Sequence, residues 1–287
     1  MRKFCFSNSY KLIAFLWMIK MSESDFKRID GKYVEINDIK MYYKEYGSGY
    51  PLILIHGGIS SIQMWEKQLP VFSKHFRVIA VDCRGQGKTN NPGGKFRYKL
   101  MVDDFAALIK ELKLDKVLLC GWSDGGQIGV EMGLHYPELI KAMVLGGTMI
   151  NQTKEMIVGF KELGIEGSRQ VDFEKLEKTL DWLVKMLKEQ TATHGEDYWK
   201  TMLLNITEMW FNPAEFPEEK VKNIQTPSLI LLGDRDDYIP VSEATEMYRL
   251  MTNSELAIIP NGNHECFITQ KEVYNQLVIN YFLKQID

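Results

Sequence analysis

The chain has 287 residues, of which 45% are hydrophobic and 25% charged, so it can bury a large core and lacks the composition of a disordered protein. Its net charge of −3 at pH 7 argues against nucleic acid as the main partner, because phosphate binding requires a basic surface. Four scattered cysteines without a CxxC pair argue against a disulfide framework, and we expect reduced thiols and a cytoplasmic location.

Residues 1–24 form an N-terminal extension whose role the sequence leaves open. An apolar stretch at 12–19 follows a basic start. It is too short for a stable membrane span, which needs about 20 residues. No small-residue cleavage site follows it, and polar sequence resumes at Met21. An upstream segment without structural role and a weak signal or surface anchor are the two alternatives.

From residue 33 onward the sequence shows strand patterns. Two short strands are expected first, at 33–37 and 41–46. Apolar runs without polar interruption then recur, and such runs are typical of strands that are covered on both faces in a parallel sheet. These runs occupy 52–55, 78–81, 117–120, 143–145, 229–232 and 256–259.

Helical patterns alternate with these strands. The clearest is 100–112, where apolar residues recur on one helical face. Further helices are expected at 127–135, 242–251 and 272–283. Alternation of strand and helix predicts the α/β class, with a mainly parallel eight-stranded sheet flanked by helices.

Residues 149–220 interrupt the alternation. They contain no β-like run, and 173–190 (FEKLEKTLDWLVKMLKEQ) reads as one amphipathic helix. A connection of about 70 residues is far longer than an ordinary crossover. We therefore predict a helical cap segment at 149–220, inserted into a core made of 25–148 and 221–287. Its large apolar side chains either form its own core or line a pocket: Trp182, Met186, Trp199, Met202, Met209, Trp210 and Phe211.

Residues with catalytic chemistry follow three of the predicted strands. Ser123 lies in GWSDGG after 117–120, acidic residues lie in GDRDDYIP after 229–232, and His264 lies in NGNHECF after the last strand. Ligands of an open parallel sheet bind at the carboxyl ends of its strands. A serine needs a base to become a nucleophile, a histidine can take and return its proton, and a carboxylate orients the histidine. We expect the three to meet at one edge of the sheet.

The glycines of GWSDGG have a geometric reason. A strand that turns directly into a helix with Ser123 at its apex needs strained dihedral angles, and side chains at 121 and 125 would clash there. Such a turn directs the backbone N–H of Asp124 at the reacting carbonyl, and the N–H of Gly58 can complete an oxyanion hole. No cofactor is needed, and the five separated histidines form no metal-binding pair.

Five motifs in this order resemble the α/β-hydrolase superfamily over residues 30–287. They are HGG at 56, DCRGQGKT at 82, GWSDGG at 121, GDRDDYIP at 233 and NGNHECF at 261. The GWSDGG turn, the nucleophile elbow, is most similar to that of biphenyl-hydrolase-like serine esterases, including the valacyclovir-hydrolase type. The resemblance implies that the acid is fourth in G-x-x-D-x-x-x-P, which selects Asp236 over Asp234 and Asp237. The other acid position, after the sixth strand, reads GGT at 146–148 and has no carboxylate.

What the resemblance implies is a serine hydrolase that cleaves a small-molecule carboxylic ester through an acyl-enzyme. Ser123 is then the nucleophile, His264 the base and later the acid, and Asp236 the group that orients His264. A C–C bond hydrolase of diketone-type substrates, a lactonase and a perhydrolase use the same triad. A ligand-binding receptor that keeps the hydrolase pocket is an alternative of another class. The sequence predicts neither the natural substrate nor the oligomeric state.

The carboxylate of Asp124 raises a separate question because it stands beside the serine. It either attracts a substrate ammonium, as the resemblance to amino-acid ester hydrolases suggests, or is tied up by neighbouring loops. Trp122 and Trp210 are further candidate substrate contacts. We expect His56 and Arg84 to hold their loops, with anion binding as the alternative for Arg84, and Cys83, Cys120 and Cys266 to pack. His194 lies in the predicted cap, where substrate contact is the less favoured interpretation.

Overall fold

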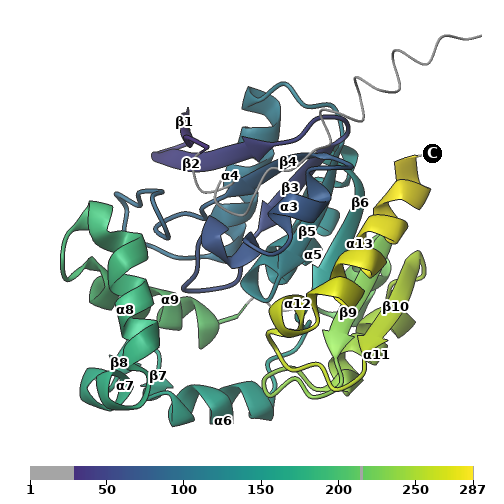
Figure 1. Ribbon diagram of the computed structural model, residues 1–287. Helices are drawn as coiled ribbons and strands as arrows, with labels where there is room; N and C mark the ends of the chain where they lie inside the picture. The colour runs from purple at the N-terminus through teal and green to yellow at the C-terminus, as the bar shows by residue number, and fades with distance from the viewer. Residues whose placement is uncertain (1–28, 214–215, 287) are drawn as a thin grey trace, which may run out of the picture.

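The computed structural model describes residues 29–213 and 216–286 (Figure 1). The predicted N-terminal extension at 1–24 lies outside the described residues. Within the described ranges, no helix combines the length and the apolar character needed to cross a membrane.

An eight-stranded sheet forms the centre of the molecule, with the strand order β1-β2-β4-β3-β5-β6-β9-β10. The β1–β2 and β2–β4 pairs are antiparallel, and all other neighbouring pairs are parallel. The predicted fold class is therefore confirmed. The strands are β1 (Lys32–Ile36), β2 (Ile39–Tyr46), β3 (Pro51–Ile55), β4 (Arg77–Val81), β5 (Val117–Trp122), β6 (Ile140–Gly146), β9 (Ser228–Gly233) and β10 (Ser254–Ile259).

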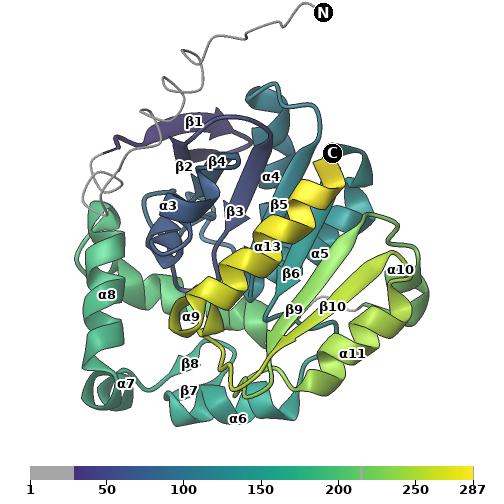
Figure 2. The same ribbon diagram turned by 45° about the vertical axis from the view of Figure 1, so that its right-hand side comes forward.

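Helices cover both faces of this sheet, as Figure 2 shows for α13 in front and α5 behind. Successive side chains of a strand point to opposite faces. Along β5, Val117 and Leu119 pack into one buried cluster and Leu118 and Cys120 into the other, which is why the run is apolar without interruption. The first cluster includes α4 (Tyr98–Glu111), α5 (Asp124–His135) and α11 (Val241–Leu250), and the second α3 (Leu69–Phe72), α12 (Cys266–Thr269) and α13 (Lys271–Ile286).

The cap segment connects β6 to β9 and lies beyond the carboxyl ends of the strands, at the lower left of Figure 1. Its apolar side chains continue the cluster that contains α4 and α5. The elements in and after it are α6 (Lys154–Glu162), β7 (Ile165–Gly167), β8 (Gln170–Val171), α7 (Phe173–Thr179), α8 (Asp181–Thr191), η3 (Ala192–His194), α9 (Tyr198–Trp210) and α10 (Glu218–Lys222).

Three features of this segment differ from the sequence prediction. A small antiparallel sheet, β7 with β8, stands where no strand was expected, with Arg169 in its turn at φ 55°. The single helix expected at 173–190 is two, because Leu180 leaves the helical conformation at φ −137° and ψ 51°. Leu176 before the break and Leu187 after it are both buried, so the apolar period gives no sign of it. The predicted boundary after residue 220 falls inside α10, which contacts α11.

Candidate active site

Ser123 lies at the apex of a sharp turn between β5 and α5. Its φ of 56° and ψ of −118° are strained for a residue with a side chain. A Cβ on Gly121 would lie 2.0 Å from the carbonyl oxygen of Gly125, and one on Gly125 would lie 2.1 Å from that of Ile55. The glycines therefore allow strand and helix to meet, and the turn holds the Ser123 side chain at the wall of a cavity.

Asp236 and His264 form a close pair at the same edge of the sheet. His264 Nδ1 lies 2.8 Å from Asp236 Oδ2, and the Asp236 carboxylate is fully buried. Its other oxygen accepts the backbone N–H groups of Tyr238 and Ile239, each at 2.9 Å. Asp237, by contrast, is exposed. Of the acids in GDRDDYIP, the structure brings Asp236 to the histidine.

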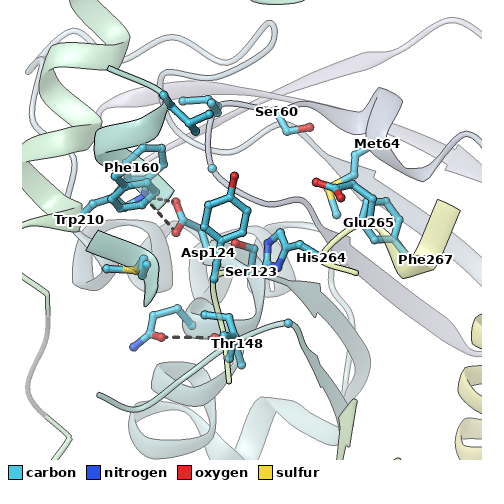
Figure 3. Close-up of a pocket in the computed structure, with 18 of the residues that line it drawn as sticks. Ser60, Met64, Ser123, Asp124, Thr148, Phe160, Trp210, His264, Glu265 and Phe267 are labelled. Atoms are coloured by element: carbon cyan, nitrogen blue, oxygen red, sulfur yellow. Dashed lines mark hydrogen bonds between the residues drawn. The ribbon is translucent and has the colours of Figure 1, made fainter. Parts of the chain in front are cut away.

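The three predicted triad side chains come from separate loops that follow β5, β9 and β10. Figure 3 shows the Ser123 and His264 side chains next to each other. Both residues line the same cavity. Asp236 fixes the His264 ring from one side, and the ring borders the cavity that Ser123 also lines.

The electrostatics of this pair favour a basic imidazole. Burial alone would lower the pKa of His264. The hydrogen bond and charge of Asp236 outweigh burial, with added charge effects from Glu265 and Asp124, so the pKa is raised above its ordinary value. A histidine with a raised pKa is a stronger proton acceptor once it is neutral.

Gly57 and Gly58 run alongside the nucleophile. A Cβ on Gly57 would come 3.2 Å from Ser123 Cβ, and one on Gly58 would come 2.5 Å from Asp124 Oδ2. Asp124 is the first residue of α5, and the N–H groups of a first helical turn have no partner inside the helix. Gly58 and Asp124 both line the cavity beside Ser123.

The Asp124 carboxylate is held by side chains from the core and the cap segment. Tyr98 donates its hydroxyl to Oδ1 at 2.8 Å, and Trp210 donates Nε1 to Oδ1 at 3.1 Å and to Oδ2 at 2.9 Å. Burial raises the pKa of Asp124, and the hydrogen bonds from Trp210 and Tyr98 act in the opposite direction. Trp210, a candidate substrate contact, also lines the cavity.

Trp122 does not have the position expected of a substrate contact. It is 1% exposed and packs beneath the site against Phe267 and Tyr274, outside the cavity lining. Its Nε1 donates to the backbone oxygen of His264 at 3.0 Å. The prediction failed because a large aromatic residue beside the serine can point either way from the strand, and here it points into the core. Trp122 supports the loop that carries His264.

Comparison with known proteins assigns the chain to a family. Residues 50–271 match the family model described as alpha/beta hydrolase fold, which covers well over half of the chain. This chain is an α/β hydrolase. The resemblance identified from the five motifs is thereby confirmed, and its elbow, its sheet and the order of its strand-end motifs are those of a member of the family.

Three individual relatives illustrate the similarity. This α/β hydrolase is 27% identical over 263 residues to the serine hydrolase BPHL of Homo sapiens, covering 86% of this chain and 84% of that protein. It is 25% identical over 300 residues to 2-hydroxy-6-oxo-6-(2'-aminophenyl)hexa-2,4-dienoic acid hydrolase of Metapseudomonas resinovorans, covering 94% and 98%. A mutant of the meta-cleavage product hydrolase CumD from Pseudomonas fluorescens IP01 matches with a TM-score of 0.75 and 25% identity, covering 89% and 98%.

The cavity of this α/β hydrolase lies between the core and the cap segment and has a volume of about 620 Å³. Ser123 and His264 lie between Trp210 with Phe160 on one side and Met64 with Phe267 on the other (Figure 3). Phe160 stacks on Trp210 with ring centroids 4.7 Å apart. The cavity can therefore hold a small, largely apolar molecule with its reacting group at Ser123.

The cap aromatics and methionines divide between the two predicted roles. Trp199, Met202 and Met209 are at most 1% exposed and form the inner packing of the cap segment. Trp182, Met186 and Trp210 line the cavity. Helical period alone could not separate the two sets, because the fold turns different cap helices toward the cavity.

Two residues predicted to hold loops do so. The His56 Nε2 accepts the N–H of Cys83 at 2.9 Å, which leaves its Nδ1 to donate to the Gly57 oxygen at 2.6 Å. Burial lowers the pKa of His56 to about 4, so it stays neutral. Arg84 bonds Asp104 and Asp38, at 2.7 Å in each case. These contacts fix the two loops that border Ser123 and the end of β4.

Other predicted positions lie away from the chemistry. His194 contacts the Gly87 oxygen at 3.0 Å and lies outside the cavity lining. Cys83, Cys120 and Cys266 are buried free thiols. Within the described part of the chain, no group of three or more His, Cys, Asp or Glu side chains could hold a metal ion.

Several cavity residues were missed by the sequence analysis. Tyr238, inside the acid motif, packs edge-on against the His264 ring with centroids 5.1 Å apart. Tyr98 holds Asp124 but starts a helix far from any motif, and its position gave no signal. Gln127 lines the cavity four residues after Ser123, and that spacing on one helical face was a signal that could have identified it.

Proposed function

We propose that this α/β hydrolase is a serine hydrolase that cleaves a small-molecule carboxylic ester through an acyl-enzyme. His264 takes the Ser123 proton as the hydroxyl oxygen attacks the ester carbonyl carbon. The N–H groups of Gly58 and Asp124 stabilise the resulting oxyanion. The tetrahedral intermediate collapses when His264 gives the proton to the leaving alcohol. Water, deprotonated by His264, then attacks the acyl carbon. The second tetrahedral intermediate collapses when His264 returns the proton to Ser123 Oγ, which releases the acid.

One observation carries this proposal. A fully buried carboxylate lies 2.8 Å from His264 Nδ1 while Ser123 occupies a strained turn at the wall of the same cavity. Burying a carboxylate and straining a backbone both cost stability, so both are hard to account for in a pocket that only binds a ligand. Catalytic turnover of an ester, as opposed to stoichiometric binding, separates this proposal from a receptor.

The charges of the cavity favour an uncharged ester over an acid substrate. Lys67 is the one Lys or Arg side chain among the described residues that line the cavity, and it pairs with Glu66 at 3.0 Å. Asp124 and Glu265 line the cavity as well. A substrate carboxylate would therefore enter without a cation of its own, at a high desolvation cost.

C–C bond hydrolysis is the second candidate. The similarity to the Metapseudomonas resinovorans hydrolase over 94% of the chain favours it. The name of that relative gives a dienoic acid as its substrate. A comparison of kcat/KM for neutral esters and for a diketone acid distinguishes the two candidates. We expect the esters to be turned over faster by this chain.

The experiment that tests the proposal replaces the nucleophile. Ser123→Ala should abolish turnover of p-nitrophenyl esters and covalent labelling by a fluorophosphonate probe. Ser60→Ala is the matched control, because Ser60 also lines the cavity and should leave labelling in place. Labelling that survives in Ser123→Ala would overturn the assignment.

For Asp124, we propose that the carboxylate ties the cap segment to the elbow and does not serve as an ammonium site. Its hydrogen bonds from Tyr98 and Trp210 support this choice. We expect Asp124→Asn to leave the preference between amino-acyl and plain acyl esters unchanged. A selective loss of amino-acyl ester turnover would instead support an ammonium site.

The cytoplasmic location also stays a prediction, based on the scattered cysteines.

A further inference from the structure

Two buried polar side chains meet in the wall of the active-site cavity: Gln127 of α5 and Thr148, two residues beyond β6. Their exposed fractions are 7% and 5%. The Thr148 hydroxyl donates to Gln127 Oε1 at 3.3 Å, the bond that Figure 3 draws at Thr148. The proposed catalytic steps use neither side chain, although both line the cavity.

The backbone holds this pair close to the nucleophile. The Gln127 N–H donates to the Ser123 oxygen at 3.0 Å, and the Ser123 N–H donates to the Gly146 oxygen at 2.8 Å. Residues four apart share a helix face, which places Gln127 about one turn, roughly 6 Å, beyond Ser123 along α5. A Cβ on Gly126 would lie 2.7 Å from Thr148 Cβ, so glycine at 126 lets Thr148 pack against the helix.

Half of the Gln127 amide has no partner. A carboxamide carries two N–H donors on Nε2 in addition to its acceptor oxygen. Thr148 satisfies the oxygen, and none of the described residues accepts a hydrogen bond from Nε2. The Nε2 atom keeps some accessible surface at the cavity wall, so an acceptor that enters the cavity with the substrate can take its hydrogen bond.

The charge of that acceptor is restricted. A substrate carboxylate at Nε2 would be buried without a paired cation, because the Lys67 ammonium already pairs with Glu66. A neutral carbonyl, ether or hydroxyl oxygen avoids this cost. Such an oxygen would also gain a hydrogen bond that a methylene group at the same position cannot make.

We propose that Gln127 and Thr148 form a polar subsite for an uncharged oxygen of the substrate, a few bonds from the carbonyl that Ser123 attacks. This proposal rests on the proposed ester hydrolysis and names its substrate class, esters that carry a keto, ether or hydroxyl oxygen in the chain. Gln127 donates to that oxygen. Thr148 is a positioning residue, because its hydroxyl holds Oε1 and leaves Nε2 for the substrate.

The test uses matched esters that differ by one oxygen. One series compares p-nitrophenyl pentanoate with its 3-oxo and 4-oxo derivatives, and a second series places an ether oxygen in the alcohol part. The wild-type chain should favour the oxygenated ester about tenfold in kcat/KM at one position of one series, the effect of one added hydrogen bond.

Four variants test whether that preference depends on the pair. Gln127→Met removes both donors at similar volume, and the ratio of kcat/KM should fall to about one. Gln190→Met is the matched control, because Gln190 also lines the cavity but its Nε2 already donates to the Ile59 oxygen at 2.8 Å. It should leave the ratio unchanged. Thr148→Val should lower the ratio, and Thr148→Ser should restore it.

The outcomes separate the subsite from the proposed function. An unchanged ratio in Gln127→Met, or no preference at any position in wild type, overturns the subsite and leaves ester hydrolysis in place. No turnover of any ester contradicts the proposed function instead. In that case the affinities of Ser123→Ala for the matched esters are measured by calorimetric titration. Tighter binding of an oxygenated ester, lost when Gln127→Met is added, supports the subsite. Equal affinity for the matched esters overturns it.

Discussion

The core and the cap segment build opposite walls of the cavity in different ways. On the core wall, polar groups are fixed by backbone bonds, as for the Asp236 carboxylate held by two N–H groups at 2.9 Å. On the cap wall, Phe160, Met186 and Trp210 present mainly apolar surface. The cap contacts core backbone oxygens through single side chains, such as Tyr198 to Gly85 at 3.1 Å. Chemistry is therefore expected to depend on the core, and substrate selection mainly on the cap.

The largest effect should follow from damage to the core wall. Asp236→Asn keeps the shape of the side chain but removes the charge that orients and stabilises His264. We expect kcat to fall about 10⁴-fold with little change in melting temperature. Asp237→Asn, at the exposed neighbouring acid, is the control and should retain activity. Equal losses in the two variants would contradict the choice of Asp236.

The second prediction compares how tightly the elbow and the cap hairpin are packed. Gly125→Ala would place a Cβ 2.1 Å from the Ile55 oxygen and should lower the free energy of unfolding by about 3 kcal/mol or more. Gly167→Ala, in the cap hairpin, meets its nearest atom at 3.4 Å and should be nearly neutral. Urea unfolding of both variants measures the difference. Similar losses of unfolding free energy in the two variants would show that the elbow is packed no more tightly than the cap hairpin.

A third prediction concerns the bond between the cap and Asp124. Trp210→Phe removes hydrogen bonds to a carboxylate and should lower the free energy of unfolding by about 2 kcal/mol. Trp199→Phe is the matched control on the same helix, because its buried Nε1 has no hydrogen-bond partner to lose. Trp199→Phe should lower the free energy of unfolding less than Trp210→Phe does. The reverse order would mean that the Asp124 bond adds little to cap docking.

The smallest effect concerns the negative charge of Glu265 at the cavity wall. Glu265 raises the pKa of His264, so Glu265→Gln should lower that pKa. The neutral base then persists to lower pH, and the acidic limb of kcat/KM against pH should move down by about 0.3 unit. Glu272→Gln, exposed on α13, should not move the limb. A limb that moves upward in Glu265→Gln would contradict the sign of the effect.

The contrast between the core and the cap segment also explains how much could be predicted from the sequence. The inner strands β3, β4, β5, β6 and β9 were predictable because both of their faces are largely buried and their sequences are therefore almost entirely apolar. Ser123 and His264 were identified because a strand-end position in a parallel sheet fixes where a side chain must lie. The elbow glycines add a steric signature, and the distances found at Gly121 and Gly125 agree with it.

Side-chain direction and cap geometry were less predictable. Trp122 and Trp210 flank the same elbow, yet one packs into the core and the other lines the cavity. The break at Leu180 leaves the apolar period intact, and the β7–β8 hairpin is too short for an alternating pattern. Asp124 received two alternative roles because its partners, Tyr98 and Trp210, are distant in sequence.

The most direct test of the central claim is the mass of the enzyme during turnover. The wild-type chain is mixed with excess p-nitrophenyl ester, quenched with acid, and analysed by intact-mass and peptide mass spectrometry. We predict an added mass equal to one acyl group, located on the peptide that contains Ser123 and absent from Ser123→Ala. Turnover without an acylated Ser123 peptide, or acylation that persists in Ser123→Ala, would contradict the account.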